Sequence, residues 1–316
     1  MMASARQKPG AAFFVLNCGV QDGPSSNIFR YRDGAGYDQD NMHYLFITQF
    51  GFELINTQKT KDFYRSDWDH TYNPTKRECP KGAMCMMCLI KQTDYSSYEN
   101  IVVHISSEGC CGDSGGIAIQ FLSDSVTEYI PLAKIVEAFS DTSCPGLKGK
   151  TRILIIQACR HSILKPEEAN DDGVPFLYGN KYDASEDAGN THNNPLVIPD
   201  DEEQHELLPP HEVPEDFLIV FSTTTNRYAK RNTKTGSWFE TELRNAVDAF
   251  RQDPTKGPDM DFLTILTETS DRVAKKESRS QNPNEDGKKN VPCFEHRLTK
   301  QIIFRCLQRM QLLNCS

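Results

Sequence analysis

The chain of 316 residues has no apolar run long enough to cross a membrane, because a spanning helix needs about 20 consecutive apolar residues. The early stretch from Ala11 to Leu16 is also too short and lacks a cleavage-type flank, so no secretory signal is expected. Basic residues are scarce, with 35 Lys and Arg against 44 Asp and Glu and a net charge of −9. This balance argues against a nucleic-acid partner or an acidic membrane surface.

The sequence contains eleven cysteines. Without a secretory signal, reduced thiols in the cytoplasm are expected. Cys85 and Cys88 have the Cys-x-x-Cys spacing of half a zinc site, but Cys79 is off that spacing and no second such pair follows, Cys110 and Cys111 being adjacent. We therefore interpret these residues as free thiols and expect no metal and no cofactor.

Apolar runs of strand length alternate with segments of helical spacing, which predicts an α/β fold with a mostly parallel sheet covered on both faces. The expected strands are 11–18, 52–56, 101–105, the run before Cys159, 217–221 and 300–304. The expected helices are 40–50, 131–139, 236–250 and 262–274.

Residues 161–214 change in character, being rich in Asp, Glu, Asn, Pro and Gly and poor in apolar side chains. Such a composition indicates a mobile linker. The chain is thus divided into a short tail at 1–10, a large region at 11–160, the acidic linker at 161–214 and a small region at 215–316.

One cysteine follows a predicted buried strand directly, in the sequence Gln157-Ala158-Cys159-Arg160 after Ile153–Ile156. The carboxyl ends of parallel strands are where α/β proteins usually build their sites. The tetrapeptide resembles the segment around the nucleophile of caspases, which have a His about 50 residues upstream. His104 lies 55 positions before Cys159.

Further segments resemble caspases in the right order, which identifies the chain as a member of that family over about residues 11–305. They are Arg32–Asp38 (similar to the N-terminal Arg-x-Gly-Thr-x-x-Asp loop, with Ala35 for Thr), Pro131–Arg160, Tyr228–Phe239, and Pro292-Cys293 with Leu298-Thr299-Lys300.

The resemblance implies a caspase-like three-layer fold with a central six-stranded sheet. It also implies a zymogen that is processed into two subunits, a cysteine endopeptidase activity that cleaves after Asp in apoptotic signalling, and a dimer joined through the C-terminal strands. The short N-terminal tail resembles that of executioner caspases.

The resemblance places Arg32, Gln157 and Arg231 around the carboxylate of a substrate Asp, with Tyr228 beside them. The planar fork of arginine suits this role because it meets a carboxylate with two charge-assisted hydrogen bonds. The family usually has an aromatic residue where this chain has Lys230, so a different preference is expected for the substrate residue before the Asp.

The catalytic pair departs from the family pattern. Cys159 is the expected nucleophile, and its backbone N–H and that of Ser106 are candidates for the oxyanion hole. A gapless alignment puts Ile105 at the position of the catalytic His, and His104 falls one residue early. Because successive side chains of a strand point to opposite faces, His104 would then point away from the sulfur. A β-bulge could instead realign His104 as the base.

Two functions follow from these observations. The first is a catalytically impaired, decoy-like caspase homologue that regulates an active caspase by binding it or its substrates. The second is an active caspase that uses Cys159 and His104. The linker contains three candidate cleavage sites, each followed by a small residue, at Asp172, Asp183 and Asp187.

Overall fold

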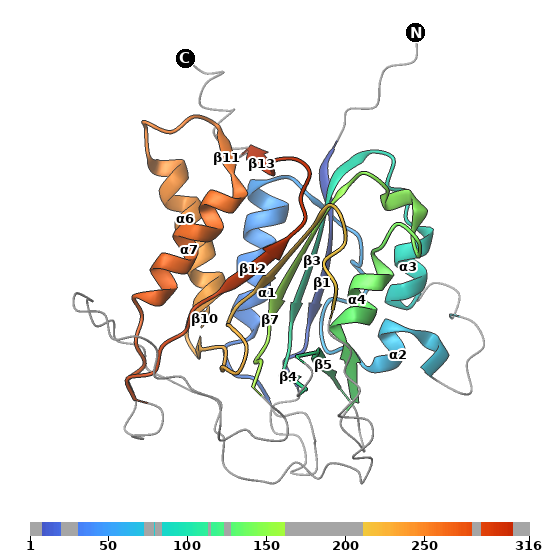
Figure 1. The fold of residues 1–316 in the computed structure, drawn as a ribbon, viewed down its shortest axis with the longest axis horizontal. Helices are drawn as coiled ribbons and strands as arrows, with labels where there is room; N and C mark the ends of the chain where they lie inside the picture. The colour runs from blue at the N-terminus through green and yellow to red at the C-terminus, as the bar shows by residue number, and fades with distance from the viewer. Residues whose placement is uncertain are drawn as a thin grey trace.

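A six-stranded sheet runs through the middle of the molecule in the order β12-β8-β7-β3-β1-β2 (Figure 1). Neighbouring strands are parallel except β12, which is antiparallel to β8. The strands are β1 (Lys8–Leu16), β2 (Glu53–Leu54), β3 (Tyr98–Ser106), β7 (Thr151–Gln157), β8 (Phe217–Phe221) and β12 (Cys293–His296).

The computed structural model describes residues 8–19, 31–72, 79, 84–112, 115–122, 128–161, 211–279 and 286–305. Within these residues, the helical segments are α1 (Gly36–Met42), η1 (His43–Gln49), α2 (Arg65–Trp68), η2 (His70–Tyr72), α3 (Met86–Gln92), α4 (Leu132–Ala138), η3 (Pro145–Leu147), α6 (Trp238–Gln252) and α7 (Phe262–Ala274). Small sheets are formed by β4 (Gly109–Cys111), β5 (Ile117–Phe121) and β6 (Glu128–Pro131), by β9 (Arg231–Asn232) and β10 (Gly236–Ser237), and by β11 (Asp259–Asp261) and β13 (Ile303–Arg305).

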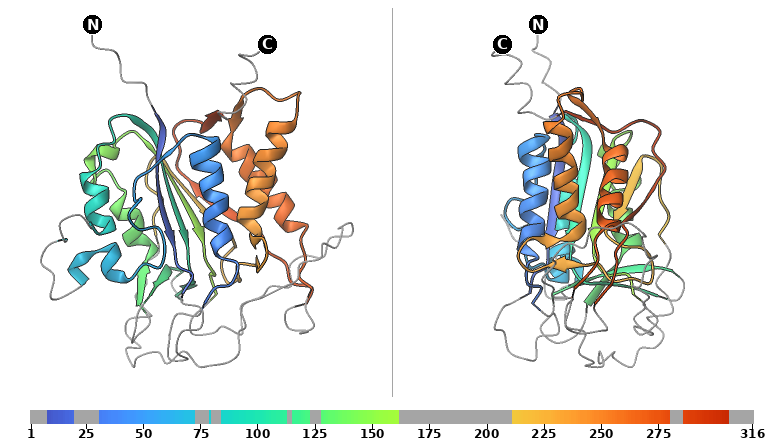
Figure 2. Two further views of the ribbon diagram at one scale, coloured as in Figure 1. Left: turned by 180° about the vertical axis from the view of Figure 1, so that it is seen from behind. Right: turned by 90° about the vertical axis from the view of Figure 1, so that its left-hand side faces the viewer.

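The sheet divides the hydrophobic core into two layers, one on each face. On one face the core includes side chains of α2, α3 and α4, and on the other those of α1, η1, α6 and α7. Figure 2 shows α1 and α6 side by side on the second face, where Tyr44 donates a hydrogen bond to Asp248 at 2.7 Å. The central strands are apolar on both sides because both faces are covered, which confirms the predicted three-layer α/β fold.

Alternation along the strands decides which face each side chain joins. In β3, Val103 and Ile105 belong to the core beside α2–α4, whereas Val102 belongs to the core beside α6 and α7. In β7, Leu154 and Ile156 face the first layer, and Ile155 faces the second. His104 therefore lies on the α6 side of the sheet.

The C-terminal strands differ from the prediction. Residues 303–305 form β13, which pairs with β11 outside the central sheet, and the sixth central strand is β12 instead. β12 has no apolar run, and Glu295 and His296 are exposed, because a strand at the sheet edge is paired on one side only. The sequence pattern therefore did not predict it.

Most other elements match their predicted ranges within a few residues, although the helix predicted at 40–50 is a short α-helix that continues as a π-helix. Nearly all of the predicted linker at 161–214 lies outside the described residues. Among the helices that are described, none is both long and apolar enough to span a membrane.

Candidate active site

The candidate site lies where the parallel strands end at one edge of the sheet, at the lower edge in Figure 1. β3 ends at Ser106 and β7 at Gln157, and these two residues are register partners. Cys159 follows two positions later and is half-buried. The C-terminal edge of the parallel strands thus carries the expected nucleophile together with a predicted substrate-binding residue.

Arg32 is buried beside the end of β3. Its Nη1 donates to the backbone oxygen of Asn17 at 2.7 Å, and its Nη2 donates to the hydroxyl of Ser106 at 3.3 Å. Its Nε lies 3.2 Å from Oε1 of Glu108. Glu108 was missed by the sequence analysis, although it lies only two residues after Ser106. The pairing holds the guanidinium in place and partly neutralises it.

Arg231 in β9 approaches the same region from the small region of the chain. Its Nε donates to the backbone oxygen of Asp33 at 2.8 Å, and the described residues offer its terminal nitrogens no further hydrogen bond. Burial, and then the charge of Arg32, lower the pKa of Arg231. The structure thus brings two arginines from distant segments close enough to influence one another.

Gln157 is 1% exposed, and its Oε1 finds no hydrogen-bond partner among the described residues. An unpaired buried amide oxygen has a free-energy cost of about 1–3 kcal/mol. Such groups are tolerated where a ligand or water completes them. Gln157 is the register partner of Ser106, whose hydroxyl accepts a hydrogen bond from Arg32.

Asp38 in α1 is the main organising residue that the sequence analysis did not single out as functional. Its carboxylate is fully buried and accepts hydrogen bonds from the hydroxyl of Ser106 at 2.9 Å and from the hydroxyl and backbone N–H of Ser237 at 2.6 and 2.7 Å. It therefore ties β3 to the start of α6 behind Arg32. Its only sequence signal was its place at the end of the Arg32–Asp38 motif.

Two glycines allow the backbones of the site to approach closely. A Cβ on Gly109 would lie 2.8 Å from the backbone oxygen of Cys159, and one on Gly34 would lie 2.7 Å from that of Asn232. Gly34 also has a φ of +77°, which side chains disfavour. The first contact packs the loop after β3 against Cys159, and the second holds the Arg32 loop beside β9.

Cys159 is a weakly acidic thiol in this arrangement. Burial raises its pKa to about 12, with a further increase from Glu108, while the backbone N–H of Ala229 and the charges of Arg32 and Arg231 act in the opposite direction. No histidine side chain hydrogen-bonds to this thiol within the described part of the chain. The reactive thiolate is therefore a minor species at neutral pH.

His104 is fully buried, and its Nε2 lies 2.6 Å from Oε1 of Glu240 in α6. Its ring also packs edge-on against Phe14, with ring centroids 5.8 Å apart. In register it sits opposite Ile155, four residues before Cys159, or up to about 13 Å along an extended chain. The imidazole is thus engaged in the core on the α6 side.

The neighbours of His104 along β3 offer no replacement base. Ile105 packs into the core on the opposite face. The hydroxyl of Ser106 donates to Asp38, and that of Ser107 donates to the backbone oxygen of Gln120 at 2.6 Å. None of these three side chains accepts a proton at neutral pH.

Tyr228 packs with two other side chains, His161 and Lys230. Its ring stacks on His161 with centroids 4.7 Å apart, and Nζ of Lys230 lies 5.9 Å from the tyrosine ring centroid. His161 follows Arg160 directly, so this group lies beside the Cys159 segment. The candidate cleavage sites Asp172, Asp183 and Asp187 lie outside the described residues.

Comparison with known proteins identifies the class to which this fold and site belong. The family described as Caspase domain matches residues 19–303, and the chain is a member of the caspase family. The predicted family is therefore confirmed.

Among its relatives, caspase-3 of Mus musculus is 29% identical over 220 residues, covering 69% of this chain and 64% of that protein. Caspase-7 of Gallus gallus is 29% identical over 255 residues, covering 78% of this chain and 67% of that protein. The chain thus spans about two thirds of the length of these relatives. In structure it resembles caspase-1 of Spodoptera frugiperda, with a TM-score of 0.58, 20% identity, and 94% and 89% of the two chains covered.

Proposed function

We propose that this protein is a catalytically impaired caspase homologue that binds an Asp-bearing segment of a substrate or of an active caspase, and so regulates proteolytic signalling. The observation that carries this proposal is the contact between His104 and Glu240. It holds the histidine of β3 in the core, and no histidine among the described residues hydrogen-bonds to Cys159 in its place. A nucleophilic cysteine needs such a base or a depressed pKa, whereas the pKa of Cys159 is raised.

Binding is supported by the charges around Gln157. Burial lowers the pKa of Arg231, and repulsion from the charge of Arg32 lowers it further. A carboxylate would relieve this repulsion and accept the hydrogen bonds that the terminal nitrogens of Arg231 can donate. An Asp side chain of a peptide has the right size and charge for this role.

We also expect a dimer to form through the edge strand β12 of the central sheet. β12 lies at the end of the central sheet, and its partner on the inner side is β8. Arg297 donates to the backbone oxygen of Phe217, so in an antiparallel ladder the N–H groups of Phe294 and His296 point outward. We expect a second caspase-family chain to pair there, and His296→Pro to weaken dimerisation in sedimentation experiments.

The proposal is tested by the turnover of fluorogenic peptides that end in Asp, with the linker cut beforehand so that zymogen latency cannot hide activity. Cys159→Ala provides the blank, and His104→Gln tests the base with little change in size. We expect wild-type turnover equal to the blank. Turnover that both substitutions abolish would contradict the proposal.

That outcome would instead support the second function, an active caspase with Cys159 as the nucleophile and His104 as the base. One observation favours it: the charges of Arg32 and Arg231 and the N–H of Ala229 all act to lower the pKa of Cys159. An activated state would also require His104 to leave Glu240. A structure with a peptide aldehyde bound would show whether this rearrangement occurs.

A further inference from the structure

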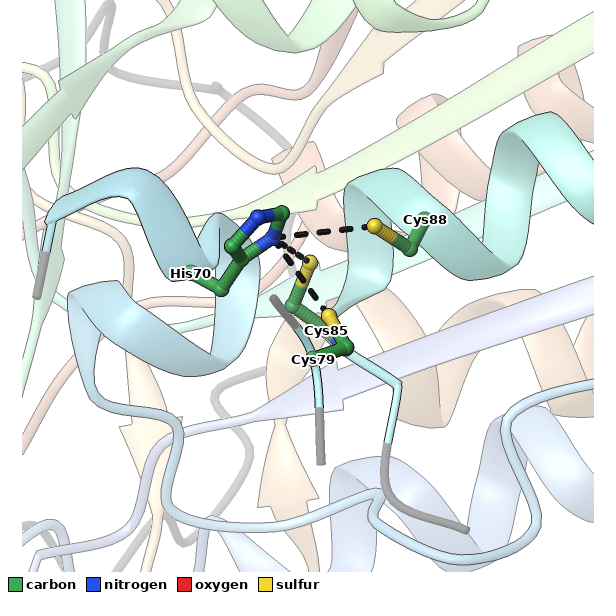
Figure 3. A group of neighbouring side chains, drawn as sticks. All are labelled: His70, Cys79, Cys85 and Cys88. Carbon is green, nitrogen blue, oxygen red and sulfur yellow. Dashed lines mark hydrogen bonds between the residues drawn. The ribbon is translucent and has the colours of Figure 1, made fainter. Parts of the chain in front are cut away.

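Four side chains that play no part in the site above form a compact group around one centre (Figure 3). Nδ1 of His70 lies 3.3 Å from Sγ of Cys85, 3.4 Å from that of Cys79 and 3.6 Å from that of Cys88. All four donor atoms lie within 4.8 Å of one another. We call this group the Cys3His cluster.

The distances match those of a tetrahedral zinc centre. With Zn–S bonds of about 2.3 Å and a Zn–N bond of about 2.0–2.1 Å, tetrahedral geometry separates sulfur from nitrogen by about 3.6 Å. The three observed separations are 3.3, 3.4 and 3.6 Å. We infer that the Cys3His cluster is a structural zinc site.

The chemistry of the donors favours zinc over harder cations. Three thiolates and one imidazole form a soft set that suits zinc, whereas magnesium and calcium prefer oxygen ligands. On binding, the three thiols would release their protons, and neutral His70 would coordinate through Nδ1 with its remaining proton on Nε2. The four ligands fill a tetrahedral shell, so no position is left for a substrate or a reactive water.

A further contact orients the sulfur of Cys79. The backbone N–H of Cys85 donates to this sulfur at 3.3 Å, and such outer contacts hold metal ligands in position. The cluster is only partly exposed, with Cys85 buried and the other three side chains half-buried. The preorganised geometry and partial burial are typical of a structural site.

The metal would join two short helical segments, η2 and α3. His70 begins the single turn η2 directly after α2, while Cys85 precedes α3 and Cys88 lies in its first turn. Trp68 of α2 packs on Phe121, with ring centroids 6.0 Å apart, and Met86 of α3 is in the same core layer. Zinc would therefore link the segment after α2 to α3 and stabilise their packing in the α2–α4 layer.

The sequence pattern alone favours free thiols here, because no second Cys-x-x-Cys pair follows. The missing ligand is His70, which lies nine residues before Cys79. Its spacing matches no simple zinc pattern, so only the fold brings it to the cluster. The zinc site is independent of the function proposed for Cys159 and would persist if that proposal failed.

The first test measures metal content in the full chain, purified under reducing conditions with and without zinc in the growth medium. Elemental mass spectrometry should find one zinc per chain, and cobalt substitution should give the charge-transfer and d–d absorption of a tetrahedral thiolate site. Cys79→Ser, Cys88→Ser and His70→Gln should each weaken zinc binding by at least about tenfold. Cys18→Ser, which changes a half-buried cysteine outside the cluster, should leave it unchanged.

A second measurement needs no substitution and so avoids variants that fail to fold. In the native protein a chelator should raise the alkylation rates of Cys79, Cys85 and Cys88 but not that of Cys18, and should lower the melting temperature. Three results would each overturn the inference. They are a zinc-free protein with chelator-independent melting, iron in place of zinc, and a disulfide within the cluster under reducing conditions.

Discussion

Nε2 of His104 and Oε1 of Glu240 lie 2.6 Å apart, and both side chains are fully buried. Burial lowers the pKa of His104 to about 4 and raises that of Glu240 well above its ordinary value. Both shifts disfavour the charged forms, so we interpret the contact as a hydrogen bond between a neutral carboxyl group and a neutral imidazole, not as an ion pair. The contact joins β3 to α6 across one face of the sheet.

Replacing Glu240 tests this protonation state. Glu240→Gln keeps a donor that can reach Nε2 of His104, so we expect the free energy of unfolding to change by less than about 1 kcal/mol. Glu240→Ala removes the donor and leaves a cavity, and should cost about 2–4 kcal/mol. Urea unfolding of the three proteins measures both changes, and an equal loss in the two variants would point to a buried ion pair instead.

The same pair predicts a pH dependence of stability. In the unfolded chain, the histidine has its ordinary pKa of 6.5 and the glutamate its ordinary pKa of 4.5. Between these pH values, the unfolded state holds more protons than the folded state at His104 and fewer at Glu240. The His contribution to stability therefore rises with pH and the Glu contribution falls, so that the two oppose each other in the wild-type protein.

Glu240→Gln removes the Glu240 contribution to stability, which falls with pH, and leaves the His104 contribution, which rises with pH. Relative to wild type, the free energy of unfolding of this variant should increase with pH above 4.5, by up to about 1.4 kcal/mol per pH unit. Urea titrations at several pH values measure this difference, in which other titrating groups cancel. Parallel profiles for the two proteins would show that Glu240 does not hold an extra proton in the folded state in this range.

The proposed carboxylate site depends on the shape of Arg231 as well as its charge. Arg231→Lys keeps the charge but loses the planar fork, so the affinity for a fluorescent peptide ending in Asp should fall about 10- to 100-fold. Arg305→Lys is the control, since this arginine pairs with Asp259 at the protein surface. Fluorescence anisotropy measures both, and equal affinities for wild type and Arg231→Lys would place the ligand elsewhere.

The raised pKa of Cys159 predicts slow alkylation. With a pKa of about 12, the thiolate fraction at neutral pH is about 10³-fold smaller than that of a free cysteine thiol. Iodoacetamide should therefore modify Cys159 far more slowly in the native protein than in the urea-unfolded chain, as followed by peptide mass spectrometry. Faster reaction in the native protein would indicate an activated nucleophile.

Much of the fold was determined by patterns that operate over a few residues. The apolar run before Cys159 and the run at Phe217–Phe221 specify buried strands, because both faces of the sheet are covered. The order of short motifs from Arg32 to Thr299 was enough to identify the caspase family. Alternation along β3 likewise predicted that His104 and Ile105 face opposite sides of the sheet.

Only the tertiary structure decided which distant residues His104 and His70 contact. Glu240 lies 136 residues after His104, and His70 meets cysteines that lie 9, 15 and 18 residues after it in the chain. The edge strand β12 was also missed, because with one side unpaired it needs no apolar run. Such contacts depend on how whole layers pack, and a local pattern cannot encode which distant side chain completes a hydrogen bond or a metal shell.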